Sequence, residues 1–289
     1  MDNKSNITVF GATGRIGKAV LGFLSAAGVP ATAITRNKDK AFTLPFITWV
    51  EADMNDKHSL DGILRHTRTV FLSSAMTEGF VRAQGNVIAA ADEQGVSFVV
   101  KLSSRMADEH SDLFIARAHG EVEALMKASA IQGVLLRPEG FMQNWLGEAA
   151  QTVKHERRIY DGAGDGKRAY IDLRDIAEVA FTVLTQPEKH ACHAYELTGD
   201  SAVNYHQVVS VIGRAIGEPV AYVPLTLEET AERLAGRGLP PAMVQTFLSY
   251  MRDQRAGKTA VPSTDVRDIL GKPARTVEAF VTEHADVFR

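Results

Sequence analysis

The fold is decided by one stretch near the N-terminus, Ile7-Thr8-Val9-Phe10-Gly11-Ala12-Thr13-Gly14-Arg15-Ile16-Gly17. An apolar run predicted as a strand leads into three glycines spaced Gly-x-x-Gly-x-x-Gly, and a helical pattern follows them. A dinucleotide pyrophosphate needs backbone N–H groups at close range, which glycine permits by turning tightly, while the helix N-terminus adds partial positive charge. The stretch therefore predicts a nucleotide-binding loop, with an ordinary glycine-rich turn as the alternative. The predicted contacts come from Gly11, Thr13, Gly14, Arg15, Ile16 and Gly17.

A cationic residue follows the second predicted strand, 31–35, at the position that discriminates between the two nicotinamide dinucleotides. NAD-selective proteins carry Asp or Glu about 20 residues after the glycine loop to bind the ribose diol, whereas this chain has Arg36. A guanidinium can hold a 2′-phosphate through charge-assisted, often bidentate hydrogen bonds. Arg15 and Lys40 would add to the same basic pocket. The pattern favours NADP(H) over NAD(H), the alternative being that Arg36 is a solvated charge at the end of a strand.

The composition is that of an ordinary globular protein. Of the 289 residues, 45% are hydrophobic and 23% are charged, enough to bury one large core or two unequal ones. The formal charge of −3 gives no excess of positive charge that would attract nucleic acid or an anionic membrane. No apolar run approaches the roughly 18 residues that span a bilayer. One cysteine, Cys192, cannot form an internal disulfide, and Met1-Asp2-Asn3-Lys4-Ser5 has no apolar signal region. A cytoplasmic location is therefore expected, with neither nucleic acid nor membrane as a partner.

Strand and helix patterns alternate through the first half of the chain, which predicts a parallel sheet with helices on both faces. The predicted strands after the first are 31–35, 47–51, 69–72, 97–102 and 133–136, and the predicted helices are 58–66, 81–93 and 116–130. The expected fold class is α/β, a Rossmann-type doubly wound parallel sheet. Such a sheet binds its nucleotide across the carboxyl ends of the strands, where the strand order reverses.

The pattern changes after Arg137. A glycine-rich stretch at 160–167 is followed by a helix near 174–180 and a strand near 193–197, and the residues from 204 onward are mostly helical in pattern. We expect residues 1–137 to form an NADP-binding domain to which 168–200 returns. Residues 138–167 and 201–289 are expected to form a smaller, mostly helical domain that binds the substrate.

Seven short motifs carry a resemblance to a known family. They are Gly11-Ala-Thr-Gly14-Arg-Ile-Gly17, Arg36-Asn37, Glu51-Ala52-Asp53, Leu102-Ser103-Ser104, His119-x-x-x-Glu123, Leu136-Arg137-Pro138 and Tyr170-Ile-Asp172-x-Arg174-Asp175-Ile-Ala177. Together they resemble the NmrA-like atypical short-chain dehydrogenases/reductases, and among these the triphenylmethane reductase and NADPH quinone oxidoreductase type. The resemblance implies that Asp53 lies by the adenine, although a helix-capping role is an equal alternative. It also implies that the nicotinamide side is lined by Leu72, Ser73, Ser74, Leu102 and Ser103.

The chain departs from the wider superfamily at its catalytic positions. That superfamily typically uses Tyr-x-x-x-Lys, but none of the six tyrosines here has a lysine four residues later. His119 and Glu123 occupy the equivalent helix one turn apart, so the carboxylate could orient the imidazole as a general acid. The alternative is a structural hydrogen bond that holds the helix to the sheet. No metal is expected, because neither this pair nor His190-x-Cys192-His193 offers a complete ligand set.

The missing tyrosine limits the plausible chemistry. Quinones, conjugated dyes and iminium ions delocalise or neutralise an incoming electron pair, so placement beside a nicotinamide can suffice and solvent can supply the proton. We expect an NADPH-dependent reductase of quinone-like, imine or other conjugated small molecules; the alternative is a non-catalytic NADP(H) sensor acting through a protein partner. The oligomeric state is left open, a homodimer being one option. The predicted pocket residues are Phe141, Met142, Asn144 and Trp145; for the aromatic residues Phe141 and Trp145, membership of the core is the alternative.

Overall fold

The computed structural model describes residues 7–289, so the segment Met1-Asp2-Asn3-Lys4-Ser5, for which no targeting signal is expected, lies outside the described residues. The chain divides into two compact units. The first unit runs to Arg137 and includes Ile176–Glu196, and the second comprises Pro138–Asp175 and Leu197–Arg289. The segment that returns to the first unit is thus narrower than the predicted 168–200.

A seven-stranded parallel sheet forms the centre of the first unit, as predicted, with the strand order β3-β2-β1-β4-β5-β6-β8. The strand order reverses beside β1, because β2 lies on one side of it and β4 on the other. Ligands of doubly wound sheets bind outside the carboxyl ends of the strands at such a reversal. The strands are β1 (Ile7–Val9), β2 (Ala31–Thr35), β3 (Ile47–Glu51), β4 (Thr69–Leu72), β5 (Phe98–Leu102), β6 (Gln132–Pro138) and β8 (Ala194–Leu197).

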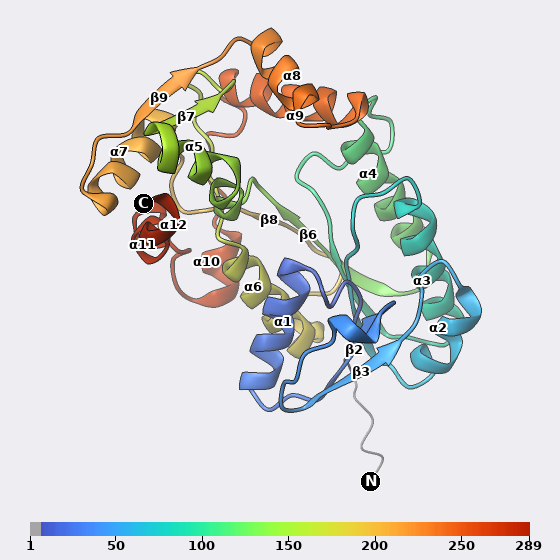
Figure 1. The fold of residues 1–289 in the computed structure, drawn as a ribbon. Coiled ribbons are helices and arrows are strands. Elements are labelled where there is room, and N and C mark those ends of the chain that lie inside the picture. The colour runs from blue at the N-terminus through green and yellow to red at the C-terminus, as the bar shows by residue number, and fades with distance from the viewer. Residues whose placement is uncertain (1–6) are drawn as a thin grey trace. The chain divides into compact units, whose positions relative to one another are not determined.

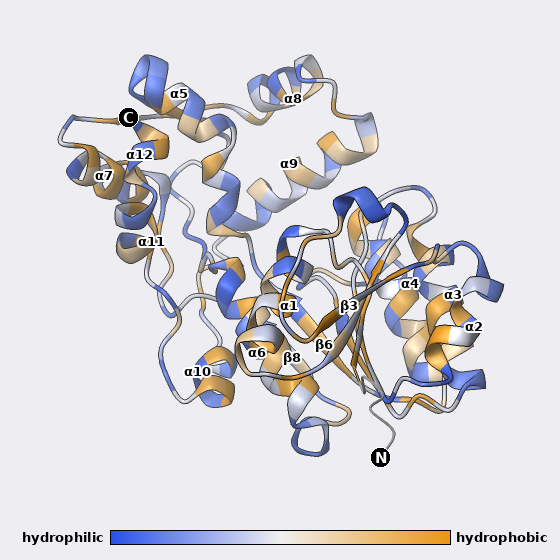
Figure 2. Ribbon diagram, turned by 60° about the horizontal axis from the view of Figure 1, so that its bottom comes forward, coloured by the Kyte–Doolittle hydropathy of each residue, from blue (hydrophilic) through white to orange (hydrophobic). Residues whose placement is uncertain are grey.

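Helices cover both faces of this sheet (Figure 1). On one face lie α1 (Arg15–Ala26) and α6 (Leu173–Thr185), whose Phe23 and Phe181 rings stack; on the other lie α2 (Lys57–Leu64), α3 (Phe80–Glu93) and α4 (Phe114–Ala128). The strands are apolar and the helices present polar outer surfaces, as Figure 2 shows. Buried side chains of α2, α3 and α4, among them Leu60, Val87 and Val122, pack on the sheet and form the core of this face.

The second unit has a core of its own, in which helices pack around a two-stranded sheet. The strands β7 (Arg158–Asp161) and β9 (Ala221–Pro224) pair in parallel. The sequence predicted helices in this region but missed the small sheet. Its four-residue strands pair residues that lie 63 positions apart in the chain, such as Ile159 and Tyr222.

The helices of this unit are α5 (Glu148–Glu156), α7 (Tyr205–Ile216), α8 (Leu227–Gly236), α9 (Pro241–Arg255), α10 (Asp265–Leu270), α11 (Val277–Glu283) and α12 (Ala285–Phe288). Short 3-10 helices occur in both units: η1 (Lys38–Lys40) and η3 (Pro187–Lys189) lie in the first unit, and η2 (Met142–Leu146) lies in the second. Of the helices that the structure describes, none is both long enough and apolar enough to cross a membrane.

Candidate active site

The glycine loop between β1 and α1 has the geometry of a dinucleotide cradle. Gly11 has a left-handed φ of +69°, and a Cβ there would lie 2.3 Å from the Ser73 Oγ. A Cβ at Gly17 would lie 2.3 Å from the Gly11 carbonyl oxygen, because helix and loop approach closely here. The Gly14 N–H donates to the same Gly11 carbonyl at 2.9 Å. The protein's own packing therefore requires glycine at positions 11 and 17.

Gly14 differs from the other two glycines, because the protein's own packing constrains its size least. Its φ of −77° and ψ of 167° suit any residue, and a Cβ would meet only the Gly11 carbonyl oxygen, at 3.2 Å. Gly14 is exposed and caps α1 without a side-chain hydrogen bond, so the first N–H groups of the helix stay available for an anion. The exposed backbone at Gly14 thus fits a pyrophosphate, which a side chain there would displace.

Basic residues surround the end of β2. Arg36 and Lys40 are exposed, and the turn that carries them is held by Thr35, whose Oγ1 donates to the Asn37 carbonyl oxygen at 2.8 Å. The Asn37 side chain in turn accepts from the Asp39 N–H at 2.8 Å and starts η1. Arg36 therefore stands at a defined strand end. Its role as a 2′-phosphate ligand, shared with Lys40, remains a prediction.

Asp53, the predicted adenine-side residue, follows β3 and folds back on its own chain. Its carboxylate accepts from the Asn55 backbone N–H at 2.9 Å and from the Asn55 Nδ2 at 3.0 Å. These bonds, with smaller help from the charges of Arg36 and Arg82, lower the pKa of Asp53. The N-cap of α2 is Asp56, whose side chain accepts from the His58 N–H. The capping alternative for Asp53 is therefore wrong, and the adenine role stays a prediction.

The residues predicted to line the nicotinamide side lie at the carboxyl ends of β4 and β5, the edge that also carries the glycine loop. Leu72 is fully buried, and Ser73 donates its hydroxyl to the Phe10 carbonyl oxygen at 3.1 Å, which ties it to the loop. The Ser74 hydroxyl accepts from the Gln84 Nε2 at 3.0 Å. Leu102 is only partly buried, so it is better placed than Leu72 to meet a ligand.

Glu123 binds different partners from the one the sequence indicated. Its buried carboxylate accepts from the Ser103 hydroxyl at 2.5 Å. It also accepts from two nitrogens of Arg137, Nε at 3.0 Å and Nη2 at 2.5 Å. The prediction that Glu123 orients His119 is therefore wrong, because the carboxylate accepts hydrogen bonds from Ser103, which follows β5, and from Arg137 on β6. It holds α4 to the sheet through these two residues.

His119 pairs instead with a buried lysine on β5. The Lys101 Nζ donates to the His119 Nδ1 at 2.9 Å and to the Leu102 carbonyl oxygen at 3.2 Å. The imidazole also meets the Phe80 ring edge-on, with ring centres 4.9 Å apart. Burial, and then the Lys101 charge, lowers the pKa of His119 to about 2. A neutral imidazole with so low a pKa is poorly suited to donate a proton at neutral pH.

Lys101 should make stability depend on pH. Burial lowers the pKa of Lys101 to about 7, whereas an unfolded lysine has a pKa of about 10.4. Between these values only the unfolded chain holds the extra proton, so the free energy of unfolding rises with pH, by at most about 1.4 kcal/mol per unit. Urea unfolding between about pH 7 and 9 should show a steeper rise in the wild type than in Lys101→Met. Parallel slopes for the two proteins would contradict this.

The predicted pocket residues separate into two groups in the second unit. Met142 and Trp145 are only 1% and 2% exposed and belong to its hydrophobic core. Trp145 packs against Tyr170, with ring centres 4.8 Å apart. The prediction of both as pocket walls is therefore wrong, and the core alternative for Trp145 holds. Phe141 is partly exposed and Asn144 is exposed, so these two remain candidates for substrate contact.

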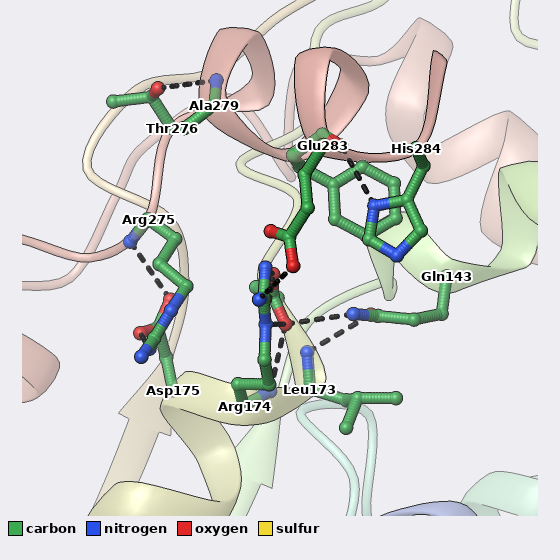
Figure 3. A network of polar contacts seen from close by, with 11 residues as sticks. Gln143, Leu173, Arg174, Asp175, Arg275, Thr276, Ala279, Glu283 and His284 are labelled. Atoms are coloured by element: carbon green, nitrogen blue, oxygen red, sulfur yellow. Dashed lines mark hydrogen bonds and ion pairs between the residues drawn. The ribbon is translucent and has the colours of Figure 1, made fainter. Parts of the chain in front are cut away.

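The motif around Asp172 is structural. Its buried carboxylate accepts from Arg174 and from the Gln143 Nε2, the latter at 2.7 Å. Asp175, also buried, accepts from the backbone N–H of Arg275 at 2.9 Å and binds its guanidinium (Figure 3). These bonds fasten the start of α6 to the segment before α11. The sequence marked the motif but gave no sign of these distant partners.

Strand order, glycine loop and basic strand end together define a dinucleotide-binding α/β protein. The chain belongs to the NmrA-like family, whose model matches residues 3–266. The resemblance inferred from the motifs is thus confirmed.

Characterised relatives span nearly the whole chain. It is 31% identical over 284 residues to an NAD(P)H azoreductase from Xenophilus azovorans, covering 98% of this chain and 99% of the azoreductase. The structure of an NADPH-dependent quinone oxidoreductase from Escherichia coli, complexed with NADPH, superposes with a TM-score of 0.87 at 30% identity, covering 96% of this chain and 99% of that one. Triphenylmethane reductase from Citrobacter sp., complexed with NADP(H), shares the fold, with a TM-score of 0.83 at 24% identity, covering 97% of this chain and 99% of that one.

Proposed function

We propose that this protein is an NADPH-dependent reductase that transfers a hydride to a quinone-like, imine or other conjugated small molecule. The observation that carries the proposal is the glycine loop, in which Gly14 is exposed at the start of α1 and is the glycine that the protein's own packing constrains least. The named activities of the azoreductase and the quinone oxidoreductase support the reaction class.

Each part of the chain has a separate task in this reaction. The loop N–H groups bind the pyrophosphate, and Arg36 binds the 2′-phosphate. Bound NADPH supplies the hydride. Ser74 and Ser103, at the ends of β4 and β5, position the nicotinamide side, and each is itself held by a buried side chain of α3 or α4. Water supplies the proton that balances the reduction.

The second unit is assigned to substrate binding in this proposal, with Phe141 and Asn144 as the residues to test. A cytoplasmic location is also proposed, supported by the single cysteine, Cys192. The partner is a small molecule.

Steady-state oxidation of NADPH against a panel of acceptors tests the proposal. The panel contains a neutral quinone, an azo dye, a cationic triphenylmethane dye and a cyclic imine. We expect NADPH-dependent reduction of at least one class by the wild type, and none by a Gly14→Val variant. Absence of turnover with every class, in protein that binds NADPH, would overturn the assignment as a reductase.

His119 should contribute little to this chemistry. General acid catalysis by a protein group typically contributes about 10²–10⁴-fold, whereas the low pKa of His119 predicts that His119→Ala slows quinone turnover less than about tenfold. The variant should melt at a lower temperature, because it loses the contacts with Lys101 and Phe80. Single-turnover kinetics and thermal melts measure both effects. A folded variant with normal NADPH affinity and a thousandfold slower hydride step would make His119 the catalytic acid.

A further inference from the structure

Arg137, near the carboxyl end of β6, has a guanidinium of which only some N–H groups are hydrogen-bonded within the protein. Its side chain is 26% exposed. Nε and Nη2 both donate to Glu123, while the structure records no hydrogen-bond partner for Nη1 among residues 7–289. One face of a permanently charged group is therefore fixed, and its remaining N–H donors are free to bind a ligand.

The buried carboxylate of Glu123 fixes one side of the Arg137 guanidinium. Glu123 is 2% exposed and binds Arg137 through a two-point, charge-assisted fork, which fixes the plane of the guanidinium. The same carboxylate accepts the Ser103 hydroxyl at 2.5 Å. Ser103 is joined to β6 by its N–H, which donates to the Leu136 carbonyl oxygen at 2.7 Å. Arg137 thus stands beside Ser103 at the carboxyl edge of the sheet, where ligands of this fold bind.

The charges around Arg137 keep its guanidinium protonated. The hydrogen bonds that Arg137 donates to Glu123, together with the charges of Glu123 and Glu196, raise its pKa. Glu196 on β8 is itself paired with Arg105, whose Nη2 lies 3.1 Å from its carboxylate. Lys101, the other neighbouring base, is fully buried behind the strand. The positive charge that a ligand meets at this point is therefore that of Arg137.

We propose that Arg137 is a catalytic residue whose free N–H groups bind the substrate oxygen that becomes negatively charged when the hydride arrives. This inference rests on the proposed reductase function and narrows its substrates to quinones and other conjugated carbonyl compounds. Such substrates develop an oxyanion, which a preorganised donor stabilises. Cationic dyes and iminium ions become neutral when they accept the hydride, so Arg137 does not stabilise their transition state. Before the hydride arrives, the positive charge of Arg137 repels them.

The electron balance is simple. A quinone accepts a hydride, the electron pair displaced by the new C–H bond moves onto the carbonyl oxygen, and one proton from water completes the hydroquinone while NADPH leaves as NADP⁺. Arginine does not give up its proton. Arg137 therefore stabilises the oxyanion until water protonates it, and this explains how the site can work without the tyrosine of the wider superfamily.

The test compares Arg137→Met/Glu123→Leu with wild type. The double variant avoids leaving Glu123 buried without its partner, which would destabilise the fold. Arg117→Met is the matched control, because Arg117 is a half-exposed arginine on the same helix as Glu123 that takes no part in the proposed site. Removal of an oxyanion donor typically costs about 10²–10³-fold in kcat. We expect kcat with a neutral naphthoquinone to fall about a hundredfold more than kcat with a cationic triphenylmethane dye, because the dye reports only the release of Ser103 from Glu123.

A binding measurement provides a readout independent of turnover. The anion of 2-hydroxy-1,4-naphthoquinone already carries the oxygen charge, and calorimetry on NADP⁺-saturated protein should show it binding at least about tenfold more weakly to the double variant, about 1.4 kcal/mol. If the double variant does not fold, Arg137→Lys replaces it, because lysine keeps the charge but loses the fixed fork; the same selective loss is expected.

Equal loss for quinone and dye, or unchanged anion binding in a folded variant, would overturn the role of Arg137. A wild type that reduces none of the acceptors but binds the anion through Arg137 would overturn the reductase proposal instead. The two failures are therefore distinguishable.

Discussion

Gly14→Val is expected to abolish NADPH binding while leaving the protein folded. The valine side chain would fill the space assigned to the pyrophosphate, yet a Cβ at this position meets only the Gly11 carbonyl oxygen, at 3.2 Å. We expect affinity to fall by on the order of a hundredfold or more, about 2.7 kcal/mol. The melting temperature should change by no more than about 2–4 °C. Calorimetric titration and thermal melts measure the two effects.

Two other glycines serve as controls. Gly17→Val places its Cβ 2.3 Å from the Gly11 carbonyl oxygen, so this variant should lose its fold together with its binding. Gly22, within α1, has nothing within 4 Å of its Cβ position, so Gly22→Ala should bind NADPH normally and be slightly more stable. Normal NADPH affinity in folded Gly14→Val would show that the loop does not hold the pyrophosphate.

The sheet and its order of elements could be predicted because each strand and helix carries its own local signal. The strand predicted at 69–72, for example, has three apolar residues after Thr69 and matches β4 residue for residue. The small sheet of the second unit carried no such signal. Its strands are short and only partly buried, as in β9 with Ala221 and Pro224 exposed, so no alternation or long apolar run marks them.

Long-range polar partners were the part that sequence could not supply. The i,i+4 spacing of His119 and Glu123 made a pair between them attractive. In the structure, strand neighbours decide the partners: Glu123 binds Ser103 and Arg137, and His119 binds Lys101. A lysine inside the apolar run 97–102 was the one available signal, since buried lysines are rare and need a partner.

For the apolar residues after β6, too, the sequence could not reveal the tertiary neighbours. Trp145 and Met142 follow the strand closely, and a pocket and a core both attract such residues. Packing against Tyr170 and Phe280 assigns Trp145 to the core. Only the tertiary neighbours distinguish a pocket residue from a core residue, because both positions favour hydrophobic side chains.

The second large effect is expected at Arg36, which should make the protein prefer NADPH to NADH by at least about tenfold, or 1.4 kcal/mol. Arg36→Asp removes the charge-assisted bonds to the 2′-phosphate and adds a repelling carboxylate, so the preference should swing by about a hundredfold toward NADH. Titration of both cofactors against both proteins gives the ratio directly. Lys38→Asp is the matched control, because Lys38 lies two residues away, equally exposed, and faces Glu51 at 3.6 Å. This control separates local recognition from a general change of charge: an equal swing in both variants, or an Arg36→Asp protein that still prefers NADPH, would remove Arg36 from the 2′-phosphate site.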